Sequence, residues 1–201
     1  MKKIFCLLSL FFITSIISCS SQISIKDPGI PNLLVTQLPY HVAIIYPKNF
    51  ENFIHEEKVI GKKSWKIDFT RSNKLLFNKI FSSFFSGITI LDGLDNTSNL
   101  EFDLVIKPSI DAIEFSVPEQ SQDETFSVWI RYRIKMFNNN GVEVINWPIS
   151  SYGKTSTSTF ANEQDLANAA VLAMRDAAAL IILQIEKSKK ITNIINVEDD
   201  Q

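Results

Sequence analysis

Apolar and polar side chains alternate along residues 127–137, and this alternation strongly constrains the fold. Because successive side chains of a strand point to opposite faces, the pattern predicts a strand with one buried face. The side chains of that face are Val128, Ile130, Tyr132, Ile134 and Met136. Asn139-Asn140-Gly141 comes next and predicts a tight turn into a second strand over 142–150, since asparagine and glycine tolerate positive φ angles.

Further short apolar runs predict strands at 40–46, 65–69, 88–91 and 102–117. In the last run, the apolar positions switch from even to odd numbers. A change of phase by one residue sends side chains to the opposite face unless a bulge or break absorbs it. Pro108 marks the expected place of this irregularity.

Two segments have the spacing of amphipathic helices. The first is predicted over 73–86, with Ser72 as its N-cap and Gly87 as a left-handed C-terminal cap. The second follows Asn162, a favourable N-cap, and its middle, 167–179, is rich in alanine. Such small side chains allow a helix to lie close to a sheet.

This order of elements predicts a single α/β (α+β) domain, in which two main helices pack on a mixed, mostly antiparallel sheet. The predicted boundaries are 1–18 for an export signal, 19–38 for a lipidated tether, 39–190 for the domain and 191–201 for a flexible acidic tail. A domain of about 150 residues is large enough to bury a substantial core.

The first residues have the order of a bacterial export signal. Lys2 and Lys3 precede an apolar run over 4–13, and a stretch of small residues follows. The run is shorter than the roughly twenty residues that a membrane-spanning helix needs. Ile16-Ile17-Ser18-Cys19 resembles the lipobox of bacterial lipoproteins; an ordinary signal peptide with a chance cysteine is the alternative.

The lipobox resemblance implies that Met1 to Ser18 is removed and that Cys19 becomes the lipidated first residue. Cys6 leaves with the signal, so Cys19 would be the only cysteine of the mature chain. A diacylglyceryl group and an amide-linked chain such as palmitate would anchor the protein stably. Ser20 rather than aspartate follows, which resembles lipoproteins sorted to the periplasmic face of the outer membrane.

No pattern in the chain amounts to a catalytic site. His41 borders an apolar strand, and His55, expected in a loop or helix, lacks the second histidine of a zinc motif. A candidate carboxylate pair could come from Asp103, Asp111 and Glu114, but strand alternation often places acidic residues in this way. We expect no enzymatic activity, cofactor or metal, and the formal net charge of −2 disfavours nucleic acid as a partner.

The polar face of the strand over 127–137 is the candidate interaction site. Its side chains are Trp129, Arg131, Arg133, Lys135 and Phe137. Three like charges on one strand face repel each other unless neighbouring groups answer them. The face is either a solvated surface balanced by Glu114 or Glu143, or a docking face, because aromatic residues and arginine are favoured at protein interfaces.

The order of elements resembles the small α/β domain of envelope assembly proteins. The resemblance depends on Val42-Ala43-Ile44-Ile45, which opens the domain, and on the alanines between Ala169 and Ala179, which close it. The similar domains are the N-terminal domain of TolB, LpoB, CsgG and YajG-type lipoproteins. Unlike CsgG, this chain has no evident pair of membrane-crossing hairpins, which argues against a pore.

The predicted anchor, the tether and the lack of a reactive site lead to two main hypotheses; a third alternative is a hydrolase, to be tested by activity screening with His41→Ala as the control. The first is a non-enzymatic outer-membrane lipoprotein that binds another envelope protein to assemble or stabilise a complex. The second is an auxiliary lipoprotein of a lipid or lipopolysaccharide transport system. It would bind an apolar ligand in a cavity of a few hundred Å³ within the phenylalanine-rich core.

Overall fold

The computed structural model describes residues 20–58, 64–91, 102–120, 123–157 and 162–188, which form a single domain of mixed α/β content. The strands are β1 (Ser20–Ser24), β2 (Leu38–Ile45), β3 (Ile54–Lys58), β4 (Ser64–Asp68), β5 (Phe85–Leu91), β6 (Leu104–Ser116), β7 (Thr125–Asn138) and β8 (Glu143–Ser156). The helices are α2 (Lys48–Glu51), α3 (Thr70–Phe84) and α4 (Glu163–Lys187). The predicted fold class is confirmed.

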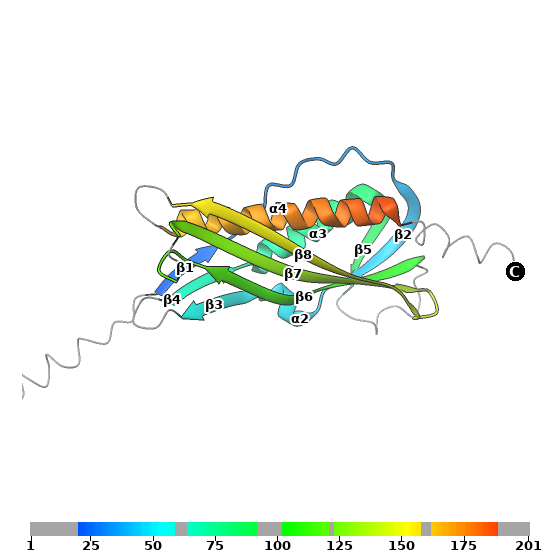
Figure 1. Ribbon diagram of the computed structural model, residues 1–201. Helices are drawn as coiled ribbons and strands as arrows, with labels where there is room; N and C mark the ends of the chain where they lie inside the picture. The colour runs from blue at the N-terminus through cyan, green and yellow to red at the C-terminus, as the bar shows by residue number, and fades with distance from the viewer. Residues whose placement is uncertain (1–19, 59–63, 92–101, 121–122, 158–161, 189–201) are drawn as a thin grey trace, which may run out of the picture.

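The strands form two sheets. A five-stranded sheet has the order β5-β2-β6-β7-β8, and a three-stranded sheet has the order β1-β4-β3. In the larger sheet, β2 is parallel to β5 and β6, whereas β6, β7 and β8 are antiparallel neighbours. Helix α4 lies along β7 and β8, and the smaller sheet lies at the end of the molecule where β7 begins and β8 ends (Figure 1).

Helix α4 is held close to the sheet. Asn162 and Asp165 form a capping box that satisfies the first backbone N–H groups of the helix. Ala169 and Ala173 are fully buried against β8, and a Cβ atom at Gly153 would lie 2.1 Å from the carbonyl oxygen of Ala169. By length and composition alone α4 could also cross a membrane, but a buried core helix passes the same test.

The aromatic side chains of the core are packed directly against one another. The Phe77 ring contacts the rings of Phe50, Phe81 and Tyr132, with centroids 5.3 to 5.8 Å apart. The Phe77 ring is stacked on Phe81, tilted to Phe50 and edge-on to Tyr132, and offset stacking and edge-on contacts are the arrangements that aromatic rings prefer. This part of the core is therefore filled by side chains.

The predictions for β7 and its turn are confirmed. All the side chains assigned to its inner face are buried, from Val128 to Met136. Gly141 adopts a positive φ of 74° at the turn into β8, as the Asn-Gly sequence predicts.

The predicted caps of α3 are wrong. The helix begins at Thr70, and the Ser72 hydroxyl donates a hydrogen bond to the Phe69 carbonyl from inside the first turn. Gly87 lies within β5, which follows α3 without a left-handed cap. The strand can begin at once because the Phe85 N–H already bonds to the Phe81 carbonyl.

The change of phase in β6 is confirmed, but its position is not at Pro108. The register with β7 shifts between Ile110 and Ala112, so Asp111 is the extra residue. Pro108 remains paired with Ile134 of β7, and the pairing of β6 with β2 has already ended at Ile106. A proline is tolerated there because no strand on that side needs its missing N–H.

The segment predicted as a tether is folded where it is described. Residues 20–24 form β1, which pairs in parallel with β4, and Ile23 and Ile25 are buried in the core. Residues 25–37, which we call the strap, continue across α3 and α4 without regular structure (Figure 1). Arg175 Nε donates to the Pro28 carbonyl at 2.9 Å, and Gln37 Nε2 donates to the Ser82 carbonyl at 3.2 Å.

Candidate interaction surface

The outer face of β6, β7 and β8 carries the predicted interaction residues. Strand register places Trp129 of β7 between Glu114 of β6 and Tyr152 of β8. One step along, Arg131 lies between Ala112 and Ser150. These side chains point away from α4 because their neighbours in β7 are buried beneath it.

Trp129 and Tyr152 form an exposed aromatic pair. Their ring centroids are 5.0 Å apart, and the residues are 45% and 41% exposed. The Tyr152 hydroxyl lies 3.1 Å from the hydroxyl of Ser127, which restricts its orientation. The pair therefore offers a large, partly fixed aromatic surface to solvent.

Arg133 and Lys135 are engaged within the sheet. Arg133 donates to both carboxylate oxygens of Asp111, with Nη2 2.6 Å from Oδ2, and Nη1 donates to Asn146 at 2.9 Å. Lys135 donates to Glu143 at 2.8 Å. The hydrogen bond and charge of Asp111 raise the pKa of the Arg133 guanidinium, and the hydrogen bond from Lys135 lowers the pKa of Glu143.

The positive charges of β7 are thus partly answered by carboxylates on the neighbouring strands. The sequence suggested Glu114 or Glu143 as the balancing carboxylates. Glu143 does pair with Lys135, whereas Asp111 at the bulge, and not Glu114, pairs with Arg133. Asp111 rather than Glu114 forms the ion pair because the bulge brings Asp111 beside Arg131 and Arg133.

Arg131 and Trp129 border a shallow hollow of about 280 Å³. Its other lining residues are Ala112, Glu114, Ile130, Ser150 and Ser151. The Arg131 side chain is 54% exposed, and its Nε lies 4.0 Å from Asp111 Oδ2. We call Trp129, Arg131, Tyr152 and Glu114 together the Trp129 surface.

Phe137 lies apart from this surface. It is eight residues from Trp129 along β7, which corresponds to about 27 Å of extended strand. Its ring is half-buried and lies 4.7 Å from the ammonium nitrogen of Lys107. The predicted residues therefore form a row along one strand, of which only the Trp129 end is both aromatic and exposed.

Both histidines are held by neighbouring side chains. His41 Nε2 lies 2.9 Å from the Thr89 hydroxyl, and its ring contacts Phe102 edge-on at 5.1 Å. His55, predicted in a loop or helix, lies in β3 instead, 3.3 Å from a Glu57 carboxylate oxygen. Within the residues that the structure describes, no set of three histidine, cysteine or acidic residues could hold a metal ion.

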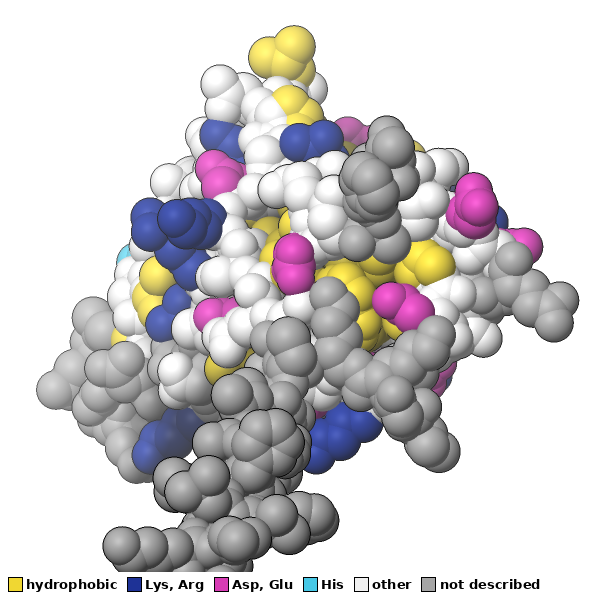
Figure 2. All heavy atoms as spheres, turned by 90° about the vertical axis from the view of Figure 1, so that its left-hand side faces the viewer, with side chains coloured by type: hydrophobic (Ala, Val, Ile, Leu, Met, Phe, Trp, Pro, Cys, Tyr) yellow, Lys and Arg dark blue, Asp and Glu magenta, His cyan; other side chains and the backbone are white. Residues whose placement is uncertain are grey.

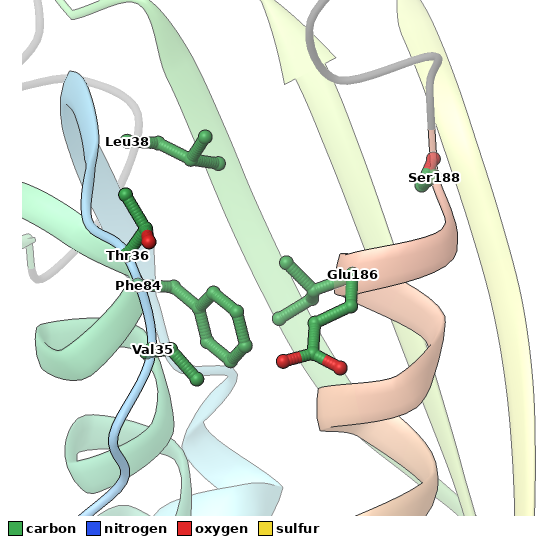
Figure 3. A pocket seen from close by; sticks show the side chains of 7 residues that line it. Val35, Thr36, Leu38, Phe84, Glu186 and Ser188 are labelled. Carbon is green, nitrogen blue, oxygen red and sulfur yellow. The ribbon is translucent and has the colours of Figure 1, made fainter.

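Two further hollows lie beside the strap and α4; both are open to solvent, whereas the ligand-carrier hypothesis expected a cavity within the phenylalanine-rich core. One of about 260 Å³ lies at the C-terminal end of α4, where the Glu186 carboxylate faces Val35 and Phe84 (Figure 3). The other, of about 480 Å³, lies nearer the middle of the helix and has a mostly apolar lining.

Comparison with known proteins assigns no family to the chain. No family model and no curated protein matches it. A minor lipoprotein of Acinetobacter baumannii is 8% identical with a TM-score of 0.47, covering 75% of this chain and 92% of that one. A hypothetical protein of Chlamydia trachomatis is 10% identical with a TM-score of 0.42, covering 73% and 96%.

A protein described as a lipoprotein of Caulobacter crescentus is 13% identical with a TM-score of 0.39, covering 56% of this chain and 79% of that one. Each of these TM-scores lies below 0.5. The proposals below therefore depend on the residues of this chain alone.

Proposed function

We propose that this chain is a non-enzymatic, lipid-anchored protein of the outer membrane that binds another envelope protein through the Trp129 surface, helping to assemble or stabilise a complex. The observation that carries the proposal is the exposed pair of Trp129 and Tyr152 beside Arg131. Tryptophan, tyrosine and arginine are the residues that most often dominate binding energy at protein interfaces.

The charges around the Trp129 surface favour a protein partner. Arg133 and Lys135 already have carboxylate partners, so docking does not leave them buried and unpaired. Arg131 and Glu114 at the hollow offer one charge of each sign to a partner. Such an arrangement fits a mixed polar and aromatic protein surface better than it fits the uniformly negative backbone of a nucleic acid.

The position of β1 supports an anchor close to the domain. Cys19 and the export signal lie outside the described residues, but Ser20 is the first residue of β1 and pairs with Ser64. A lipidated Cys19 would thus lie one Cα step, about 3.8 Å, from a paired strand. The end of the molecule shown in Figure 2 would face the bilayer; acidic and basic side chains lie on this face together with the hydrophobic ones.

Binding should depend on Trp129. In pull-downs of the tagged protein from detergent-solubilised envelopes, we expect Trp129→Ala to reduce recovery of a stoichiometric partner about tenfold or more, because truncating a central aromatic anchor removes roughly 2 kcal/mol. The matched control is Leu183→Ala, which truncates an exposed apolar side chain of α4 and should change nothing. Circular dichroism should show both variants folded.

The proposal fails if no stoichiometric partner is recovered. It also fails if Trp129→Ala and Leu183→Ala recover the same amount of it.

A further inference from the structure

The strap and α4 border an apolar hollow of about 480 Å³ that is open to solvent and that the proposed function does not use. Its lining residues are Gly29, Ile30, Pro31, Leu33, Arg175, Ala178, Ala179 and Ile182. The volume lies within the roughly 300 to 1,000 Å³ that is usual for small-molecule sites. We call it the strap hollow.

The hollow exists because short side chains of α4 face the strap, and hydrogen bonds hold the strap on either side of the hollow. Ala178 and Ala179 occupy little of the space beneath the strap. Arg175 holds the strap at Pro28, and the Lys79 ammonium bonds to Asn32 farther along. These polar contacts fix the strap without filling the space under it.

Gly29 allows the strap to pass Arg175. Its φ is +62°, a region that favours glycine, and its N–H donates to Asp27 Oδ1 at 2.7 Å. A Cβ at this position would lie 2.5 Å from Arg175 Nη2. The guanidinium therefore lies directly against the strap at the rim of the hollow.

Arg175 places a positive charge at the rim of the strap hollow. Across the part of the chain that the structure describes, Arg175 forms no ion pair, and only its Nε has a hydrogen-bond acceptor, the Pro28 carbonyl. A guanidinium has five N–H donors and binds carboxylates in a bidentate manner. Glu186, about 16 Å farther along the helix, places a negative charge at the other hollow (Figure 3).

We propose that the strap hollow binds a long-chain fatty acid, with the acyl chain on Ala178, Ala179 and Ile182 and the carboxylate on Arg175. The apolar lining matches a hydrocarbon chain, and the cationic rim matches an anionic head. The site lies on the helix-covered side of the sheet, whereas the Trp129 surface lies on the other side. Either site can therefore be disproved without affecting the other.

The test uses the whole mature chain with Cys19→Ala and measures displacement of a fluorescent fatty acid by palmitate. We expect saturable binding of one palmitate per chain. Ala179→Leu should abolish palmitate binding by filling the hollow. Gln184→Leu introduces the same leucine side chain at an exposed position of α4 outside the hollow, and this variant should bind palmitate normally.

The charge is tested separately. Arg175→Gln should weaken palmitate binding about fivefold, the effect of losing a partly exposed ion pair, whereas Arg71→Gln, at an exposed position of α3, should have no effect. A cationic amphiphile of equal chain length should bind more weakly than palmitate and should not be weakened by Arg175→Gln.

Several outcomes would overturn the proposal. One is the absence of saturable palmitate binding to the mature chain, and another is unchanged binding to Ala179→Leu. A third is binding that occurs only when the chain is ended after Ser188, which would identify its own last residues as the occupant.

Discussion

Replacing Gly153 with alanine should lower the free energy of unfolding by about 3 kcal/mol, at the upper end of the usual cost of overpacking. The added Cβ would lie 2.1 Å from the Ala169 carbonyl oxygen and 2.4 Å from the Ala173 nitrogen. Both are backbone atoms of α4, so neither can turn aside as a side chain could. The helix would have to move away from β8 and lose its close contact with the sheet.

The matched control is Gly87→Ala, measured in the same urea titrations. Its Cβ would lie 2.8 Å from the ring of His41, an exposed side chain, so relief of the clash requires only the loss of the hydrogen bond between His41 and Thr89. We expect a loss below about 1 kcal/mol there, as for most surface changes. Equal losses of stability for the two substitutions would contradict the claim that α4 packs too close to Gly153 to admit a Cβ atom.

Tyr132→Phe should destabilise the fold by about 2 kcal/mol, because it leaves a buried polar atom without its partner. The Tyr132 hydroxyl donates to Asn73 Oδ1 at 2.8 Å, and both residues are fully buried. Burial raises the pKa of the Tyr132 phenol, so it remains the protonated donor at every ordinary pH. Asn73→Leu alone should cost a similar amount by leaving the hydroxyl unpaired.

The double variant of Tyr132→Phe with Asn73→Leu should lie within about 1 kcal/mol of the wild type, since replacing both partners by apolar groups is nearly neutral. The amide nitrogen of Asn73 is also buried and has no hydrogen-bond partner among the described residues, which adds to this expectation. A double-mutant cycle from urea unfolding measures the coupling. Strictly additive losses would contradict the assigned role of this hydrogen bond.

Strand periodicity predicts much of this fold, because one buried face imposes a repeat of two on the sequence. It identifies the inner face of β7 and the turn at Gly141. It does not locate the bulge at Asp111, since the apolar positions of β6 show that the phase changes but leave several residues where it could do so. Pro108 does not mark the bulge, because the pairing of β6 with β2 has already ended at Ile106 and no strand on that side needs the missing N–H.

The first strand was missed because its pattern is weak. Only Ile23 within β1 and Ile25 directly after it are buried apolar residues, and the turn-forming residues that follow suggested a tether. Parallel pairing with β4 is a contact between segments far apart in the chain, and such contacts leave little local signal. Two further elements, α2 and β3, were missed because each is too short to show a clear periodicity.

The candidate surface was predicted in part. Alternation placed Trp129 and Arg131 on the outer face, but Tyr152 comes from β8 and was not expected beside them. Counting residues back from the Gly141 turn on both strands would have paired Trp129 with Ser151, because the register of the hairpin shifts by one residue between Met136 and Phe137. The strap hollow had no such signal, since it depends on a segment without regular structure crossing α4.

The central claim is that the folded domain is held at the membrane by lipid on the residue directly before β1. Mass spectrometry of the chain isolated from its native host tests this most directly, because trypsin cleaves after Lys26 and releases the first peptide of the mature chain. We predict a peptide that begins at Cys19 and carries a thioether-linked diacylglyceryl group and an amide-linked acyl chain. A peptide that still continues from Ser18, with a free thiol at Cys19, would contradict the account.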